Sequence, residues 1–152
     1  MGYKVSQPLD ESPLIVFFLK GFLVTLKNRI LCIEDHEDTR DVIFEILTRE
    51  GHDVTCAGNP HEALNLVEAS ERFDLYIVDT WLPGMSGLDL SKRLRELDAR
   101  IPILFFTAAA SEVDMENAFQ SGAQAYLVKP VDTERLAIKV ARLISDSNKA
   151  SC

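Results

Sequence analysis

The chain has 152 residues, a hydrophobic fraction of 47% and a formal net charge of -8. This length and composition suit one core of ordinary size and leave little room for a second domain. The pI near 4.8 and the lack of any Lys/Arg cluster argue against a direct nucleic-acid surface.

Residues 1–28 form an apolar N-terminal extension of uncertain role. The run over residues 14–26 is too short to span a bilayer, so no membrane insertion is expected. Acidic residues Asp10 and Glu11 precede it and no small-x-small cleavage site follows, so it is a poor signal peptide. Two interpretations remain: an extra helix docked on the domain or a partner, or an extension made by an upstream start. The second is preferred.

From residue 29 onward, short β-branched runs alternate with amphipathic stretches. This rhythm predicts an α/β fold of βαβ units, with five parallel strands and helices on both faces of the sheet. The strands are predicted over residues 29–33, 53–56, 75–79, 103–107 and 125–128.

The helices alternate with these strands and carry clear start and core signals. The first is predicted over residues 38–50 and ends before Gly51. Starts of the next three helices are predicted at Asn59-Pro60, Ser86-Gly87 and Ser111-Glu112. The apolar stripes expected to face the core are, in the first helix, Val42, Ile43, Ile46 and Leu47, and in the last, Leu136, Val140, Leu143 and Ile144.

Polar side chains stand at the ends of four predicted strands. Glu34 and Asp35 follow the first, Asp79 ends the third, Thr107 ends the fourth and Lys129 follows the fifth. Because right-handed crossovers bring the carboxyl ends of parallel strands to one edge of the sheet, these side chains should converge there.

Three carboxylates in one cleft repel each other, so the site must raise a pKa or hold a cation. Oxygen ligands of this kind suit Mg²⁺. Lys129 and Thr107 would let the cleft accept a phosphoryl group that its acids alone would repel. Asp79, at the centre, is the predicted nucleophile and would form an aspartyl phosphate.

Each of these residues also has an ordinary structural interpretation. A single Asp at a strand end most often caps a helix, and a single Lys is usually a surface residue. Thr107 could be a strand-end hydroxyl and Tyr126 a packing residue. Their joint occurrence favours a phosphorylation site. The three histidines, His36, His52 and His61, are assigned no chemistry, and the three cysteines, Cys32, Cys56 and Cys152, are expected to be reduced.

Four short motifs occur in a fixed order along the chain. They are Ile33-Glu34-Asp35, Val78-Asp79 with Leu82-Pro83-Gly84-Met85-Ser86-Gly87, Phe106-Thr107-Ala108, and Tyr126-Leu127-Val128-Lys129-Pro130. With these motifs, residues 27–145 resemble the receiver domain of bacterial two-component response regulators. The resemblance implies a flavodoxin-like strand order of 2-1-3-4-5. It places the domain at residues 29–146, with a short tail at 147–152.

The resemblance also implies residue roles. Asp79 would be the phosphoacceptor, with Mg²⁺ bound by Asp35 and Asp79, supported by Glu34, and completed by the backbone carbonyl of Trp81. Lys129 and Thr107 would contact the phosphoryl group, with a cis peptide bond expected between Lys129 and Pro130. Tyr126 would be the switch aromatic that turns inward when Thr107 moves.

The function implied is that of a cytoplasmic signalling switch rather than a turnover enzyme. It would take a phosphoryl group from a phosphohistidine on a histidine kinase or phosphotransfer protein and act on a downstream protein; a homodimer is left open. The closest alternative is a phosphorylation-independent interaction module with the same fold. An aspartate-based phosphatase is less favoured, because it requires a second Asp at the position of Trp81. A flavodoxin-like FMN carrier is also disfavoured, because it requires a glycine- and hydroxyl-rich phosphate cradle at the position of Glu34 and Asp35.

Overall fold

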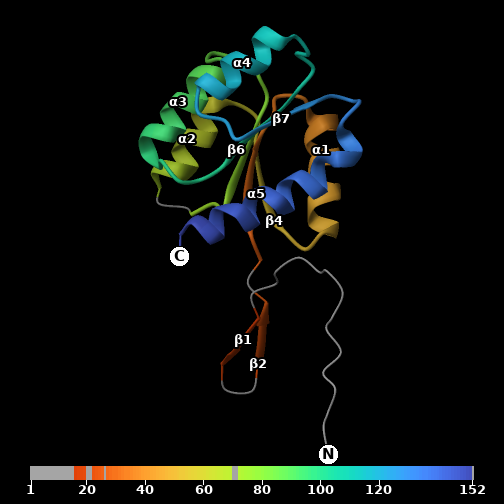
Figure 1. The fold of residues 1–152 in the computed structure, drawn as a ribbon, viewed down its shortest axis with the longest axis vertical. Coiled ribbons are helices and arrows are strands. Elements are labelled where there is room, and N and C mark those ends of the chain that lie inside the picture. The colour runs from red at the N-terminus through yellow and green to blue at the C-terminus, as the bar shows by residue number, and fades with distance from the viewer. Residues whose placement is uncertain (1–15, 20–21, 26, 70–71, 152) are drawn as a thin grey trace, which may run out of the picture.

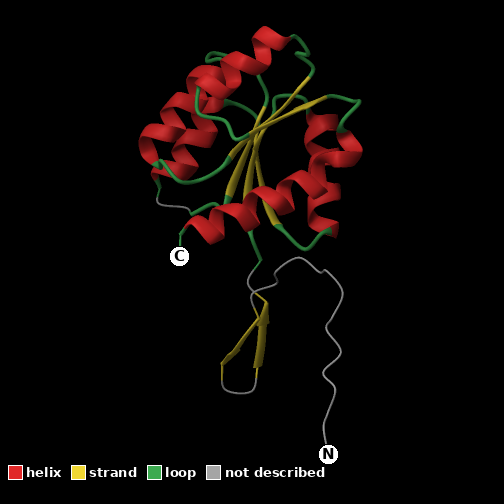
Figure 2. Cartoon of the chain, viewed as in Figure 1, coloured by secondary structure: helices red, strands yellow, loops and turns green. Residues whose placement is uncertain are grey.

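Five parallel strands form the central sheet of the computed structural model, which describes residues 16–19, 22–25, 27–69 and 72–151, with side chains from residue 27 onward. The strands are β3 (Arg29–Ile33), β4 (Asp53–Ala57), β5 (Leu75–Val78), β6 (Ile103–Thr107) and β7 (Ala125–Val128). Their order is β4-β3-β5-β6-β7, and every neighbouring pair is parallel (Figure 2). Counted within this sheet, that is the predicted order 2-1-3-4-5.

Helices cover both faces of the sheet. They are α1 (Glu37–Arg49), α2 (Pro60–Glu68), α3 (Gly87–Leu97), α4 (Glu112–Gln120) and α5 (Leu136–Ala150), with a 3₁₀ turn, η1 (Thr133–Arg135), before α5. Helices α1 and α5 pack on one face, and α2, α3 and α4 on the other (Figure 1). The predicted starts of α2, α3 and α4 are confirmed, because the side chains of Asn59, Ser86 and Ser111 each accept a hydrogen bond from a backbone N–H of the first turn.

Alternation along β3 divides the core into two layers. Ile30 and Cys32 join the cluster under α1 and α5, whereas Leu31 and Ile33 join the cluster under α2, α3 and α4. All four side chains are fully buried. Since burial of such a side chain stabilises the fold by about 1.5–3 kcal/mol, a strand buried on both faces needs the continuous apolar run found in the sequence.

The predicted core stripes of α1 and α5 are correct except at one residue. Ile43 and Leu47 are buried, but the side chain of Val42 is 46% exposed. Around the helix, Ile43, Ile46 and Leu47 lie within an arc of about 100°, and Val42 lies beyond the margin of this arc. Helix α5 continues to Ala150, because no Gly or Pro interrupts it.

The described part of the N-terminal extension is a hairpin rather than the helix considered above. β1 (Val16–Leu19) pairs antiparallel with β2 (Phe22–Thr25). Their Val, Phe and Thr residues favour strands. The role of the extension stays a prediction, and residues 1–15 lie outside the described part.

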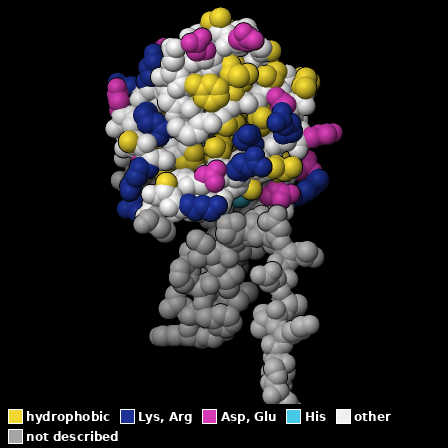
Figure 3. Space-filling view, in the orientation of Figure 1, with side chains coloured by type: hydrophobic (Ala, Val, Ile, Leu, Met, Phe, Trp, Pro, Cys, Tyr) yellow, Lys and Arg dark blue, Asp and Glu magenta, His cyan; other side chains and the backbone are white. Residues whose placement is uncertain are grey.

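The surface mixes charged and hydrophobic side chains, and the face shown in Figure 3 carries both kinds over the folded domain. Within the described residues, no helix has the length and apolar composition needed to cross a membrane.

Candidate functional site

The side-chain alternation of the strands explains which polar residues meet. Glu34, Asp79 and Lys129 each stand two residues beyond a side chain of the core layer under α1 and α5, namely Cys32, Ile77 and Leu127. Because alternate residues of a strand point to the same face, all three reach the same side of the carboxyl edge. Thr107 follows the opposite alternation, after Phe105 of the other core layer.

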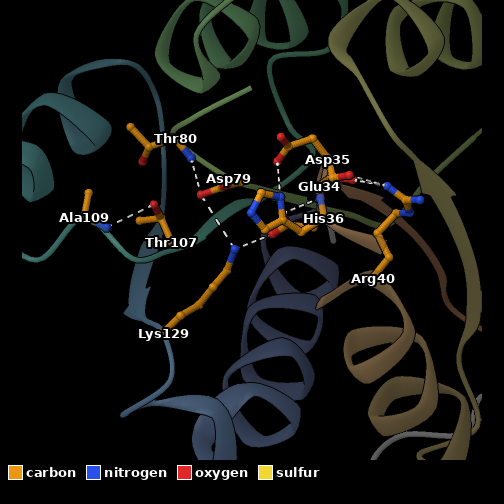
Figure 4. A network of polar contacts seen from close by, with 9 residues as sticks. All are labelled: Glu34, Asp35, His36, Arg40, Asp79, Thr80, Thr107, Ala109 and Lys129. Carbon is orange, nitrogen blue, oxygen red and sulfur yellow. Dashed lines mark hydrogen bonds and ion pairs between the residues drawn. The ribbon is translucent and has the colours of Figure 1, made fainter. Parts of the chain in front are cut away.

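Lys129 joins the two buried acids of the site. Its ammonium group donates a hydrogen bond to Glu34, and its Nζ lies 3.7 Å from Oδ1 of Asp79 (Figure 4). The side chains of Glu34, Asp79 and Lys129 are 3%, 10% and 17% exposed. Charges so far from water are costly unless paired, so the Lys129 ammonium offsets the repulsion between the two buried carboxylates.

Arg40, on α1, fixes the backbone that carries the acids. Its guanidinium donates hydrogen bonds of 2.9 Å to the carbonyl oxygens of Glu34 and Asp35. The backbone N–H of His36 donates a 3.1 Å hydrogen bond to Oε1 of Glu34. Arg40 could not be identified from the sequence, because nothing in the pattern separates it from a solvent-facing helix residue.

The loop after β5 closes tightly over the backbone of Asp79. The N–H of Thr80 donates a 2.8 Å hydrogen bond to Oδ1 of Asp79, and the N–H of Gly87 donates one of 2.9 Å to the carbonyl of Thr80. A Cβ atom at Gly87 would lie 2.0 Å from the carbonyl oxygen of Asp79. Gly87 is therefore required by close approach, a role its sequence position as a helix start did not reveal.

Thr107 and Tyr126 both bind the backbone of Ala109, in the connection from β6 to α4. The fully buried Thr107 hydroxyl accepts a 3.3 Å hydrogen bond from the N–H of Ala109, and the Tyr126 hydroxyl donates one of 2.9 Å to its carbonyl. The Tyr126 ring stacks on Phe105 at a centroid distance of 6.1 Å. Burial raises the pKa of Tyr126, while a hydrogen bond with Thr80 opposes this. The connection from β6 to α4 thus links Thr107 to Tyr126 through the backbone of Ala109.

The donor set at this edge suits a hard divalent cation. Glu34, Asp35 and His36 each offer a ligand atom, and these atoms lie within 4.8 Å of one another. His36, which the sequence analysis left without chemistry, belongs to this group, and its Nδ1 lies 3.5 Å from Oδ1 of Asp35. Asp79 is outside this group and is connected to it through Lys129. The side chain of Trp81 is exposed, and the role of its carbonyl stays a prediction.

The doubly wound sheet and the acid–lysine cluster at its carboxyl edge define a class of protein, a flavodoxin-like domain with an acidic site. The model of the response regulator receiver domain matches residues 30–141, so the chain belongs to this family of two-component signalling switches.

Known structures and relatives agree with this assignment. A CheY-like receiver domain protein from Methanospirillum hungatei JF-1 is 30% identical, with a TM-score of 0.77, and the match covers 82% of this chain and 99% of that one. The transcriptional regulatory protein YrkP of Bacillus subtilis is 39% identical over 74% of this chain and 47% of its own length. The sensory/regulatory protein RpfC of Xanthomonas campestris is 34% identical over 93% of this chain and 21% of its own length. The chain thus spans about half or less of these two curated relatives.

Proposed function

We propose that this receiver domain accepts a phosphoryl group on Asp79 from a phosphohistidine donor, in a reaction that depends on Mg²⁺. The observation that carries the proposal is the buried Asp79 carboxylate at the carboxyl edge, with the Lys129 ammonium 3.7 Å away. A carboxylate can act as a nucleophile toward phosphorus, and a nearby fixed cation stabilises the charge that the transferred group brings.

The metal would be held by Asp35 and Asp79, with support from Glu34 and the backbone carbonyl of Trp81. When bound, Mg²⁺ supplies positive charge that offsets the repulsion between carboxylates and phosphoryl oxygens. The chain's own contribution is position: Arg40 holds the backbone of Glu34 and Asp35, and Thr80 orients the Asp79 carboxylate.

Lys129 is suited to exchange partners during the reaction. Before transfer it is paired with Glu34 and lies near Asp79. As the Asp79 oxygen bonds to phosphorus and the donor nitrogen leaves, the negative charge moves outward onto the phosphoryl oxygens. Lys129 then follows this charge, because a charged phosphoryl oxygen is a stronger partner than the neutral carboxyl oxygen of an acyl phosphate.

The signal would leave the site through the connection from β6 to α4. If the Thr107 hydroxyl turns to the phosphoryl group, it gives up the hydrogen bond from Ala109, whose carbonyl holds Tyr126. The phosphoryl group stabilises the new arrangement only by contacting it better than the old one. Tyr126 would then change place and alter the surface between α4 and α5.

A shallow apolar groove beside Lys129 supports docking of a histidine kinase or phosphotransfer protein. It has a volume of about 250 Å³. Its lining residues are Asp38, Thr39, Val42, Phe106, Lys129, Pro130 and Thr133. The exposed Val42 that departs from the predicted core stripe lines this groove, so an apolar side chain of the donor could bind next to the site.

The test uses Trp81, which is the only tryptophan in the chain and lies two residues after Asp79. Its fluorescence would be followed through a Mg²⁺ titration and then after addition of beryllofluoride, a phosphoryl analogue. We expect a saturable response to Mg²⁺ and a second, Mg²⁺-dependent response that Asp79→Ala abolishes. A folded protein that responds to neither ligand would be an interaction module with a receiver fold, and the phosphotransfer proposal would be wrong.

A further inference from the structure

Two cysteines face each other across neighbouring strands. Cys32 of β3 and Cys56 of β4 are register partners. Cys32 belongs to the core layer under α1 and α5, and Cys56 packs against this layer. Neighbouring strands lie about 4.8 Å apart, within the Cα separation of roughly 4.4–6.8 Å that a disulfide requires. Both are free thiols in the structure. They can therefore be joined without sliding one strand past the other.

The two thiols differ in exposure and in their hydrogen bond. Cys32 is fully buried, whereas Cys56 lies on the edge strand β4 and is partly exposed. The Cys32 thiol donates a hydrogen bond to the sulfur of Cys56, and this bond is the main cause that lowers the pKa of Cys56. Burial opposes the shift, and the Arg40 guanidinium adds to it. A small reagent from solvent can thus reach Cys56, and the buried Cys32 is the neighbouring thiol.

We propose that Cys32 and Cys56 form an oxidant-sensitive dithiol whose substrate is a hydroperoxide. The sulfur of Cys56 attacks one peroxide oxygen, the O–O bond breaks, and a sulfenic acid forms while water leaves. The sulfur of Cys32 then attacks the sulfur of Cys56, the S–O bond breaks, and a second water leaves. Hydrogen peroxide is reduced to two waters and the two thiols are oxidised to one disulfide.

The position of the pair connects it to the phosphorylation site. Cys32 precedes Glu34 by two residues on the same face of β3. Arg40, which holds the carbonyls of Glu34 and Asp35, also acts on Cys56. A disulfide between β3 and β4 would therefore change the surroundings of Arg40 and of the segment that carries Glu34. This consequence rests on the proposed function, whereas the disulfide itself does not.

The chemistry can be tested on the full chain carrying Cys152→Ser, which leaves only the proposed pair. The protein would be treated with hydrogen peroxide, unfolded and alkylated, and its intact mass would be measured by mass spectrometry. We expect the loss of two hydrogens, no alkylation, and reversal by dithiothreitol. Digestion with trypsin should give a linked product of residues 30–40 and 50–72, the fragments that contain Cys32 and Cys56.

Two results would overturn the proposal. One is a pair of thiols that both remain alkylatable after peroxide treatment. The other is oxidation of Cys56 to a sulfinic acid while Cys32 stays free. As a matched control, Cys32→Ala should trap Cys56 as a sulfenic acid that reacts with dimedone, and circular dichroism would verify its fold.

The connection to the phosphorylation site has a separate readout. Oxidised and reduced protein should differ in the Mg²⁺ midpoint reported by Trp81 by at least twofold. An unchanged midpoint in a protein shown by mass to contain the disulfide would refute the connection alone.

Discussion

The two edges of the sheet each hold a cation among oxygen atoms, but the oxygens differ. At the carboxyl edge, Lys129 lies between the carboxylates of Glu34 and Asp79. At the amino edge, Arg95 of α3 donates to neutral acceptors. These are the carbonyls of Asp98, Ala99, Ile101 and Gly122 and the side-chain oxygen of Gln124.

This difference separates structure from function. Neutral carbonyls satisfy the donors of Arg95 without adding charge, so its network ties α3 to the segments before β6 and β7. The negative charge of the carboxylates around Lys129 exceeds its single positive charge. The carboxyl edge therefore retains an attraction for further cations. The same kind of contact therefore stabilises one edge and prepares the other for a ligand.

The largest expected effect comes from Gly87→Ala, at the carboxyl edge. Because the new Cβ would lie 2.0 Å from the carbonyl oxygen of Asp79, the free energy of unfolding should fall by about 3 kcal/mol or more. The matched control is Gly51→Ala at the amino edge, where φ is +87° but no atom lies within 4 Å of the new Cβ. Its cost should be about 1 kcal/mol. Urea unfolding measures both variants. Equal losses of unfolding free energy in Gly87→Ala and Gly51→Ala would contradict the close approach at Asp79.

Removal of the cation at the carboxyl edge should affect chemistry. Lys129→Met should slow phosphorylation by acetyl phosphate about 100-fold, because one fixed charge near the transferred group is lost. It should also lower the Mg²⁺ midpoint, because a competing cation leaves the acids. The control is Lys92→Met, which removes an exposed lysine paired with Asp89. Intact mass over time measures the phosphorylation rate of both variants, and Trp81 fluorescence measures the Mg²⁺ midpoint. A Lys129→Met protein that is phosphorylated at the wild-type rate would refute the role of Lys129.

Removal of the cation at the amino edge should affect stability alone. Arg95→Met leaves five oxygen acceptors without this donor, and the free energy of unfolding should fall by about 2–3 kcal/mol. The fluorescence response to Mg²⁺ and beryllofluoride should be retained, as in the control Arg93→Met, which alters an exposed arginine of the same helix. A lost response in a folded Arg95→Met protein would break the division between the two edges.

A smaller effect is expected at the mouth of the site. The Trp81 side chain is 69% exposed and stands two residues after Asp79, where it can shield the path of a hydrolytic water. Trp81→Asn should accelerate loss of the phosphoryl group roughly threefold, about 0.65 kcal/mol in the barrier. Release of phosphate in a single turnover measures the rate. An unchanged rate would show that the indole does not restrict water.

The smallest effect concerns His52, a buried residue near the amino edge. Burial is the main cause that lowers its pKa from 6.5. The unfolded chain therefore binds a proton more readily, and stability should fall as the pH drops below about 6.5, until the folded state is protonated too. His52→Gln should flatten this part of the curve of unfolding free energy against pH. If the slope of unfolding free energy against pH is the same in His52→Gln and in the wild type, the pH dependence must come from other groups.

The sequence was sufficient for the sheet and for the convergence of the polar residues. The apolar runs are continuous and end in charged or hydroxyl groups, so topology alone brings Glu34, Asp79 and Lys129 to one edge. It was also sufficient for the helix caps, because Asn59, Ser86 and Ser111 act through local hydrogen bonds.

Contacts between distant segments could not be predicted in the same way. The bonds of Arg40 to the acidic backbone depend on how α1 tilts over β3, and the meeting of Cys32 with Cys56 depends on strand register. The residues of β1 and β2 were ambiguous for another reason. A run that is apolar at nearly every position fits both the helical and the strand period.

The strand order also bears on how the domain is completed during synthesis on the ribosome. After β5, each new strand adds to the same growing margin of the sheet, β6 first and β7 last. Domains generally fold as units during synthesis, so the sheet can be completed only after β7 has left the exit tunnel. Glu34 and Asp79 therefore meet Lys129 in the same folding step that brings the two acids together.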